Sequence, residues 1–273
     1  MAKLTSLREG IRTITIILRN IILGGNLISL SQIGHPKNLV KYASECLFNY
    51  KTLFAKRGIP QKNVFDVLPS LDVEDIKLGR LKHGGGWFFA SSSYTADIIN
   101  LCLICQISKP KVILEIGTLR GYTTFHFALN TPDDAKIYTL DLPKKENIET
   151  ILKTTASDHH HIDSYEKSVQ YFFDGNEVAS KITCLFGDSG NYNFSSFHGK
   201  VDFFFIDGAH SYSYVRSDTL NALKCCHPGS IIAWHDFGRM GVNGVTKWLI
   251  ELSKQGHHIY AIPGGSLAFM MVT

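Results

Sequence analysis

Residues 112–124 read VILEIGTLRGYTT, in which an apolar run passes through two glycines into a segment with the apolar spacing of a helix. In a doubly wound α/β domain the first strand turns into its helix in this way, and glycine lets the backbone approach a ligand there. The free N–H groups that begin the following helix attract an anion. The stretch therefore predicts a first strand followed by a ligand-binding turn. A glycine turn without a ligand is the alternative while this stretch is taken alone.

From Lys111 onward, short apolar runs alternate with longer amphipathic segments. The apolar runs predict strands over residues 112–116, 136–141, 182–186, 201–206 and 231–234. Helices are predicted over residues 122–129, 212–225 and 245–254, and within residues 146–180. Strands that are apolar throughout and alternate with helices indicate a parallel sheet covered on both faces.

Two last apolar runs, 259–262 and 267–272, flank Pro263-Gly264-Gly265-Ser266 and predict an antiparallel hairpin. The expected fold class is therefore α/β. We expect a Rossmann-like, doubly wound and mostly parallel sheet of seven strands that ends in this C-terminal antiparallel hairpin.

We expect residues 1–80 to form a helical appendage and residues 81–273 to form the α/β domain. Apolar residues between Pro36 and Arg57 recur at the spacing of one helix face. The segment from Ile11 to Leu30 is interrupted by charges and glycines, so it does not predict a membrane-spanning helix. We expect it to pack on the main domain or on a second copy of the chain, as in a homodimer. Peripheral membrane contact through its basic flanks is the less favoured alternative.

Composition places the 273-residue chain among ordinary globular proteins. The net charge is +4, from 28 Lys and Arg against 24 Asp and Glu, which is too mild to predict a nucleic-acid partner. The six cysteines are thinly spread and mostly lie in apolar runs, which suits a reducing compartment, so we expect a cytoplasmic location. Cys102 and Cys105 form a C-x-x-C pair without a second ligand pair. Core packing is therefore favoured over a zinc site.

Polar or glycine residues follow several of the predicted strands. Asp141 lies 24 positions after Gly117 (141 − 117), close to the offset of about 20 at which an acidic residue meets a ribose. The third strand ends in Gly187-Asp188-Ser189, and the fourth in Asp207-Gly208-Ala209-His210. Because the carboxyl ends of parallel strands meet at one edge of the sheet, these residues predict a single ligand crevice.

The glycine turn discriminates between two nucleotide-like cofactors. A nicotinamide enzyme needs G-x-G-x-x-G, but Leu119 stands where the second glycine would let the pyrophosphate approach. S-adenosylmethionine (SAM) has no phosphate, so the looser G-x-x-x-G turn suits it better. The crevice is therefore interpreted as a SAM site.

Four segments together resemble class I SAM-dependent methyltransferases: residues 112–124, 139–141, 185–189 and 205–212. They look most like the small-molecule O-methyltransferases related to catechol and macrolide-sugar enzymes, and the likeness covers about Gly84 to Thr273. It implies that Asp141 holds the ribose, that Asp188 and Ser189 lie by the adenine and that Asp207 lies near the reacting centre. The whole cofactor site would comprise Glu115, Gly117, Thr118, Gly121, Asp141, Gly187, Asp188, Ser189 and Asp207.

Catechol-type relatives bind magnesium through an aspartate after the fourth strand and an acidic or amide pair after the fifth. The corresponding residues here are Asp207 and the pair His235-Asp236. Magnesium prefers oxygen ligands, so the histidine favours a softer ion such as manganese, iron or zinc. One hypothesis is therefore a divalent cation on Asp207, His235 and Asp236. A second makes His210 a metal-free general base, and in a third the histidines only position the reactants.

The sequence thus predicts an enzyme that transfers a methyl group from SAM to a hydroxyl of a small molecule such as a sugar, polyketide or aromatic metabolite. The candidate catalytic residues are Asp207, His210 and His235. A non-catalytic SAM-binding regulator and an NAD-dependent oxidoreductase with a degenerate glycine turn remain alternatives. The segments that would select the acceptor, residues 1–86 and 142–180, carry no chemistry that we can assign.

Overall fold

The computed structural model describes residues 59–68, 73, 75–79, 92–143, 148–155, 157–158, 162, 170–239 and 242–273. The helices predicted over 11–30 and 36–57 and the run His159-His160-His161 lie outside these residues. The proposed domain boundary near residue 80 stays a prediction.

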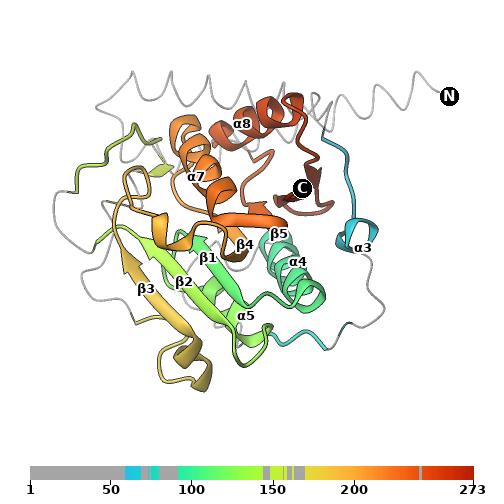
Figure 1. Ribbon diagram of the computed structural model, residues 1–273, viewed down its shortest axis with the longest axis vertical. Coiled ribbons are helices and arrows are strands. Elements are labelled where there is room, and N and C mark those ends of the chain that lie inside the picture. Colours follow the sequence, from blue (N-terminus) through green and yellow to red (C-terminus); the bar gives the residue numbers. More distant parts are fainter. Residues whose placement is uncertain are drawn as a thin grey trace.

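One sheet organises the described part of the chain, with the strand order β3-β2-β1-β4-β5-β7-β6 (Figure 1). Its strands are β1 (Val112–Ile116), β2 (Lys136–Asp141), β3 (Ile182–Phe186), β4 (Val201–Ile206), β5 (Cys226–Trp234), β6 (Tyr260–Ala261) and β7 (Ala268–Met271). Strands β1 to β5 pair in parallel, whereas β7 runs antiparallel to β5 and β6. The expected seven-stranded sheet with a C-terminal antiparallel hairpin is confirmed.

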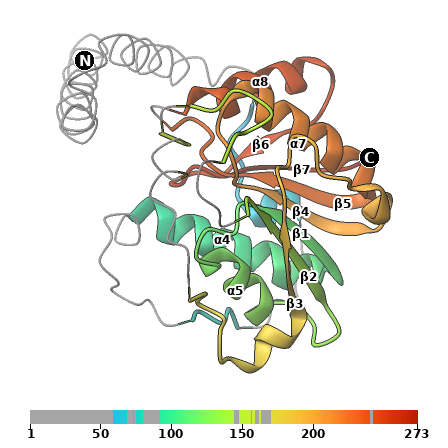
Figure 2. The same ribbon diagram turned by 90° about the vertical axis from the view of Figure 1, so that its left-hand side faces the viewer.

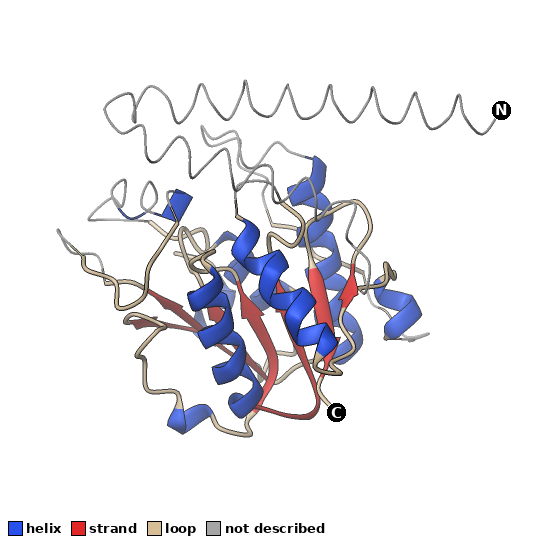
Figure 3. Cartoon of the chain, turned by 90° about the horizontal axis from the view of Figure 1, so that it is seen from above, coloured by secondary structure: helices blue, strands red, loops and turns tan. Residues whose placement is uncertain are grey.

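Helices cover both faces of this sheet (Figures 2 and 3). They are α3 (Val64–Val67), α4 (Ser92–Ser108), α5 (Tyr122–Leu129), α7 (Tyr212–Cys225) and α8 (Asn243–Lys254), with short 3-10 helices at Glu177–Lys181 and Ser195–Phe197. The side chains of β4 divide between the two faces, because successive residues of a strand point in opposite directions. Phe203 and Phe205 pack with α4 and α5, and Phe204 and Ile206 pack with α7 and α8. A strand with two buried faces is apolar throughout, as its sequence indicated.

Strand β5 begins earlier than predicted, at Cys226 instead of Ile231. Pro228-Gly229 looks like a turn in the sequence, but here it lies inside the strand. The register between β4 and β5 shifts between the pairs Val201–Cys226 and Phe203–Ile231, so extra residues of β5 are accommodated in an irregularity. The prediction was wrong because proline and glycine mark bulges as well as turns.

The predicted cysteine packing is confirmed. Cys102 and Cys105 are free and buried in α4, and burial raises the pKa of the Cys102 thiol to about 12. A protonated thiol in an apolar setting is a poor metal ligand.

Residues 59–68 belong to the same core as the sheet. Ile59 and Val64 are buried, and Gln61 forms a parallel bridge to Ala261 of β6. This part of the segment expected to form a helical appendage thus extends the edge of the sheet before α3 begins.

Gly117, directly after β1, is required by its surroundings. Its φ is +101°, and a Cβ atom would lie 2.1 Å from the carbonyl oxygen of Asp207, which follows β4. We expect Gly117→Ala to lower the free energy of unfolding by about 2–4 kcal/mol, because it adds a backbone clash to the strain of positive φ. Urea unfolding would measure this loss. Gly175→Ala is the control, since Gly175 has φ +72° but open space around it, and it should lose only about 1 kcal/mol.

Candidate active site

The glycine turn after β1 is held in place by the end of β2. Oδ2 of Asp141 accepts a hydrogen bond from the Leu119 N–H at 2.7 Å, and Oδ1 accepts one from the Leu142 N–H at 2.8 Å. The hydroxyls of Thr118 and Thr139 lie 2.6 Å apart, at hydrogen-bonding distance. This contact also connects the glycine turn to β2. The turn is thus pre-formed by Asp141, the residue predicted to bind the ribose. Asp141 therefore has a structural role beside any role in cofactor binding.

Glu115 lies beneath this turn and is almost fully buried. Its Oε2 accepts hydrogen bonds from the hydroxyls of Thr124 and Thr139, while Oε1 has no partner in the described structure. Burial raises the pKa of Glu115 to about 8, although the two threonine hydroxyls oppose the shift. A buried carboxyl oxygen without a hydrogen-bond partner is uncommon in folded proteins, and a bound water or ligand is one way to satisfy it.

The end of β3 is fixed by Asp188. This carboxylate accepts hydrogen bonds from the N–H groups of Ile151 and Gly190, both at 2.8 Å, and from the Tyr214 hydroxyl at 2.8 and 2.9 Å. Asp188 therefore joins the loop around residue 151 to α7. Its neighbour Ser189 is buried, and Gly187 lies against the ring of Tyr192, where a Cβ would approach within 2.8 Å.

Large apolar side chains are exposed beside these two carboxylates. Leu119 is 47% exposed, Phe186 is 52% exposed and Ile151 is 59% exposed. All three are connected to the strand ends: Leu119 through Asp141, Ile151 through Asp188, and Phe186 through its pairing with Asp141 in the sheet. Exposed apolar side chains gathered at the ligand-binding edge of a sheet are typical of an unfilled apolar subsite.

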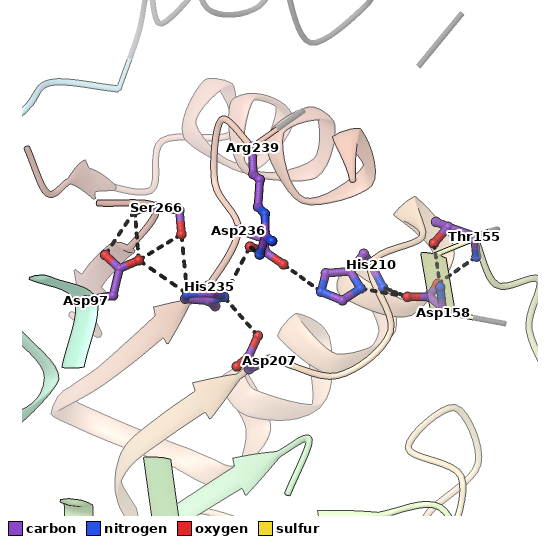
Figure 4. Close-up of polar contacts among 9 residues, drawn as sticks. All are labelled: Asp97, Thr155, Asp158, Asp207, His210, His235, Asp236, Arg239 and Ser266. Carbon is purple, nitrogen blue, oxygen red and sulfur yellow. Dashed lines mark hydrogen bonds and ion pairs between the residues drawn. The ribbon is translucent and has the colours of Figure 1, made fainter. Parts of the chain in front are cut away.

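The ends of β4 and β5 carry a connected set of charged groups (Figure 4). Nδ1 of His235 lies 3.1 Å from Oδ1 of Asp207 and 3.2 Å from Oδ1 of Asp236. The other oxygen of Asp236, Oδ2, lies 2.7 Å from Nε2 of His210. Arg239 binds Asp236 Oδ1 at 2.7 Å. The four sequence-predicted residues Asp207, His210, His235 and Asp236 are therefore brought together.

Two further carboxylates complete this set, and the sequence did not predict them. Asp158, from the chain between β2 and β3, lies 2.6 Å from Nδ1 of His210. Asp97, from α4, accepts hydrogen bonds from the N–H and hydroxyl of Ser266 and lies 3.3 Å from Nε2 of His235. A signal for Asp97 exists, because it is the only charged residue in the otherwise apolar or neutral helix Ser92–Ser108. Asp158 gives no comparable signal in a polar stretch.

The carboxylates control the charge of both histidines. Burial alone would lower the pKa of His210, but Asp158 and Asp236 outweigh it and raise the pKa to about 10. Burial also opposes protonation of His235, yet Asp207 and Asp236 raise its pKa well above the usual value. Burial would raise the pKa of Asp236, but His235 and His210 hold it well below its usual range. The neighbouring carboxylates therefore favour the protonated form of both histidines.

Both nitrogens of His210 have carboxylate partners, so in this arrangement neither is free to take a proton from a substrate. A role for His210 as a metal-free base would require one of these ion pairs to open.

The structure also gives a donor set that differs from the predicted metal ligands. One ligand atom each from Asp207, His210 and Asp236 lie within 4.8 Å of one another. His235 instead lies between Asp97 on one side and Asp207 and Asp236 on the other.

A small, partly open cavity of about 10 Å³ adjoins this cluster. Its polar lining includes Asp207, His210 and His235, and its apolar lining includes Val215, Trp234 and Val245. A volume of this size holds one water-sized sphere.

Residues 114–237 match the family model described as a methyltransferase domain. This part of the chain is therefore similar to a methyltransferase domain. The match begins inside β1 and ends one residue after Asp236, so it contains the glycine turn and the strand ends described above.

Solved structures with a similar arrangement include O-methyltransferases, each with low identity. The Bacillus cereus O-methyltransferase in complex with SAH is 21% identical, covers 66% of this chain and 82% of its own, and has a TM-score of 0.44. The O-methyltransferase TomG from Streptomyces achromogenes, in complex with SAM, is 17% identical over 67% and 82% of the two chains, with a TM-score of 0.43. The SAH-bound methyltransferase PaMTH1 from Podospora anserina is 15% identical over 65% and 78%, with a TM-score of 0.46. No curated protein sequence matches the chain closely enough to count as a relative.

The described structure thus presents two adjacent regions at the carboxyl edge of its sheet. One, around the ends of β1 to β3, offers apolar side chains and Asp141. The other, at the ends of β4 and β5, is the charged cluster. Among the residues that the structure describes, no helix is long and apolar enough to cross a membrane.

The raised pKa of Glu115 predicts a pH effect on stability. The folded protein holds the proton with a pKa of about 8, against 4.5 for the ordinary side chain, so stability is lost as the pH rises between these values. Each pH unit in this window lowers the free energy of unfolding by up to about 1.4 kcal/mol. Glu115→Gln should remove this dependence, as measured by urea unfolding between pH 5 and about 8. The exposed control Glu177→Gln should keep it, and equal slopes in both variants would contradict the assignment.

Proposed function

We propose that the chain transfers a methyl group from SAM to a hydroxyl of a small-molecule acceptor. The observation that carries this proposal is the contact between the glycine turn and the charged cluster. A Cβ on Gly117 would lie 2.1 Å from the Asp207 carbonyl, so the backbone of the turn touches the backbone at the end of β4. A methyl donor in the turn would therefore lie next to groups that can accept a hydroxyl proton.

The residues around the turn suit the parts of SAM. Leu119, Phe186 and Ile151 offer apolar surface to the adenine, and Asp141 lies between them as an acceptor for ribose hydroxyls. The Glu115 oxygen that lacks a partner suits the ammonium of the methionine end, and the start of α5, which has no side-chain cap at Gly121, suits its carboxylate. These features support the cofactor roles expected for Glu115, Gly117, Gly121 and Asp141.

In the transfer, the acceptor oxygen attacks the sulfonium methyl group and its proton leaves. The products are a methyl ether, S-adenosylhomocysteine (SAH) and a proton. We assign the first acceptance of that proton to Asp207, whose side chain is 23% exposed, whereas those of Asp236 and Asp158 are 4% and 5% exposed. His235 holds Asp207 in place through Oδ1, leaving Oδ2 for the acceptor. His235 and His210 hold the pKa of Asp236 well below its usual range and so keep it ionised behind Asp207.

A divalent cation fits the same residues. Donor atoms around an ion with bonds of about 2.1 Å lie about 3.0 Å apart when adjacent and about 4.2 Å apart when opposite. One donor atom each from Asp207, His210 and Asp236 lie within 4.8 Å of one another, so small shifts of these side chains would allow this spacing. When bound, the ion would lower the pKa of the acceptor hydroxyl. Asp207 and Asp236 would hold it through carboxylate oxygens.

The first test is titration calorimetry of the purified full chain with SAM, SAH and NAD. We expect SAM and SAH to bind and NAD to give no heat, and binding of NAD alone would contradict the proposal. The second test is SAH formation with panels of sugars, polyketides and catechols. SAM binding without turnover of any hydroxyl compound would favour a regulatory SAM-binding protein. The cytoplasmic location, the homodimer and the absence of a nucleic-acid partner remain predictions.

Phe186→Ser should weaken SAH binding by about tenfold, because the half-exposed ring contributes about 1.4 kcal/mol of apolar burial when adenine covers it. The fold should be little affected, since the ring is already 52% exposed. Phe65→Ser is a matched control, because Phe65 is 47% exposed but lies in α3, away from β3 (Figure 1). Equal SAH affinities for the two variants in calorimetry would exclude this adenine site.

Removal of divalent ions should reduce methyl transfer at least tenfold while leaving SAH binding intact. The reason is that the ion acts on the acceptor hydroxyl and not on the cofactor turn. Metal analysis of the purified protein, followed by activity assays after chelation and after re-addition of Mn²⁺ or Mg²⁺, would measure this. Full activity of the metal-free enzyme would contradict the cation.

A further inference from the structure

We propose that His210, and not His235, is the histidine that binds a divalent cation together with Asp207 and Asp236, and that Asp158 is the residue that positions His210 for this task. The structure thereby assigns a function to Asp158, which belongs to the long segment between β2 and β3. The inference rests on the proposed function in one respect, because the ion would assist the methyl transfer.

The two nitrogens of His210 face different surroundings. Nε2 faces the cluster, with Asp236 Oδ2 at 2.7 Å, and the cavity beside Asp207 is also lined by His210. Nδ1 faces away from the cluster, toward Asp158 Oδ1 at 2.6 Å. A histidine that binds a metal through one nitrogen characteristically donates the other N–H to a carboxylate, which fixes the tautomer and the ring orientation. Asp158 and His210 have this arrangement at Nδ1, and an ion bound at Nε2 would take the place of the direct contact between Nε2 and Asp236 Oδ2.

Asp158 is itself rigidly held. Its side chain is 5% exposed, Oδ2 accepts a hydrogen bond from the Thr155 N–H at 2.6 Å, and Oδ1 also accepts one from the His210 N–H at 3.1 Å. In return, the Asp158 N–H donates to the Thr155 hydroxyl. A buried carboxylate fixed by backbone donors can hold an imidazole in one orientation.

His235 is placed differently. Its Nε2 is directed at Asp97 and the hydroxyl of Ser266, both at 3.3 Å, and its Nδ1 lies between Asp207 and Asp236. His235 therefore contacts Asp97, Asp207 and Asp236, which come from three different parts of the chain. In this position it fixes the distance between Asp207 and Asp236. We assign it as a positioning residue.

The donor set also restricts the kind of ion. One ligand atom each from Asp207, His210 and Asp236 lie within 4.8 Å of one another, so the set combines two carboxylates with one imidazole. An imidazole among the ligands selects borderline ions such as Mn²⁺, Co²⁺ or Zn²⁺ over Mg²⁺. This preference comes from His210, because aspartates bind Mg²⁺ as well as the borderline ions.

The test measures ion binding by the full chain without SAM or acceptor. Co²⁺ is titrated and its visible absorption recorded, and Mg²⁺ is then added as a competitor. The wild type should bind one Co²⁺, and excess Mg²⁺ should displace it poorly. His210→Ala should lower Co²⁺ affinity at least a hundredfold, and Asp158→Asn should lower it about 10–100-fold.

The matched control is His227→Ala. His227 forms another Asp–His pair, 2.9 Å from Asp202, near the starts of β4 and β5 and far from the cluster. This variant should bind Co²⁺ like the wild type. Unchanged Co²⁺ affinity in His210→Ala, equal losses in His210→Ala and His227→Ala, or no Co²⁺ binding by the wild type would each overturn the inference.

A second measurement observes the histidine rings directly and begins with the wild type. In the wild type with Zn²⁺, ¹⁵N spectra of the histidine rings should show one ring whose Nε2 resonance shifts on binding and whose Nδ1 keeps its proton. Asp158→Asn should change the Nδ1 resonance of that same ring, and a shifted ring that is insensitive to Asp158 would overturn the assignment. Because no methyl transfer is measured, a chain that binds Co²⁺ through His210 but methylates no acceptor contradicts the proposed function alone.

Discussion

The close contact between the backbones at Gly117 and Asp207 is the constraint on which the site depends. β1 and β4 are neighbours at the point where the strand order reverses, and their two following loops leave the sheet edge side by side. With no side chain at residue 117, the turn can lie directly on the carbonyl of Asp207. The place for a methyl donor and the first residue of the charged cluster are therefore joined by the main chain. Any side chain at residue 117 would separate them.

The fold was largely readable from the sequence. Four strand ranges and the ranges of α5 and α7 were predicted as the structure has them, because a parallel strand covered on both faces is continuously apolar and ends where polar residues begin. The start of β5 was not readable, since Pro228-Gly229 has the same local appearance in a turn and in an irregular strand. Whether a Pro-Gly pair makes a turn depends on pairing with the neighbouring strand, and the local sequence carries no information about that strand.

The sequence predicted only those site residues that directly follow a strand. Asp207, His210, His235 and Asp236 were predicted to meet, because topology alone brings the carboxyl ends of β4 and β5 together. Asp158 and Asp97 meet the histidines across long sequence separations, 52 residues to His210 and 138 residues (235 − 97) to His235, through tertiary packing that no local pattern encodes. The contacts of the histidines, and therefore the nitrogen that faces the crevice, depend on these two aspartates. This is why the strand ends alone did not show which of the two histidines would belong to the proposed cation site.

The far edge of the sheet has a consequence for solubility. β6 is only two residues long, and its backbone is already engaged by residues 60–62: the Lys62 N–H donates to the Ala261 carbonyl, and the Ala261 N–H donates to the Pro60 carbonyl, both at 3.0 Å. An open edge strand is a template on which another chain can add a strand and begin aggregation. The segment just before α3 thus acts as a cover that closes the sheet against self-association at β6. Truncations that remove residues 59–68 would uncover that edge as well as shorten the chain.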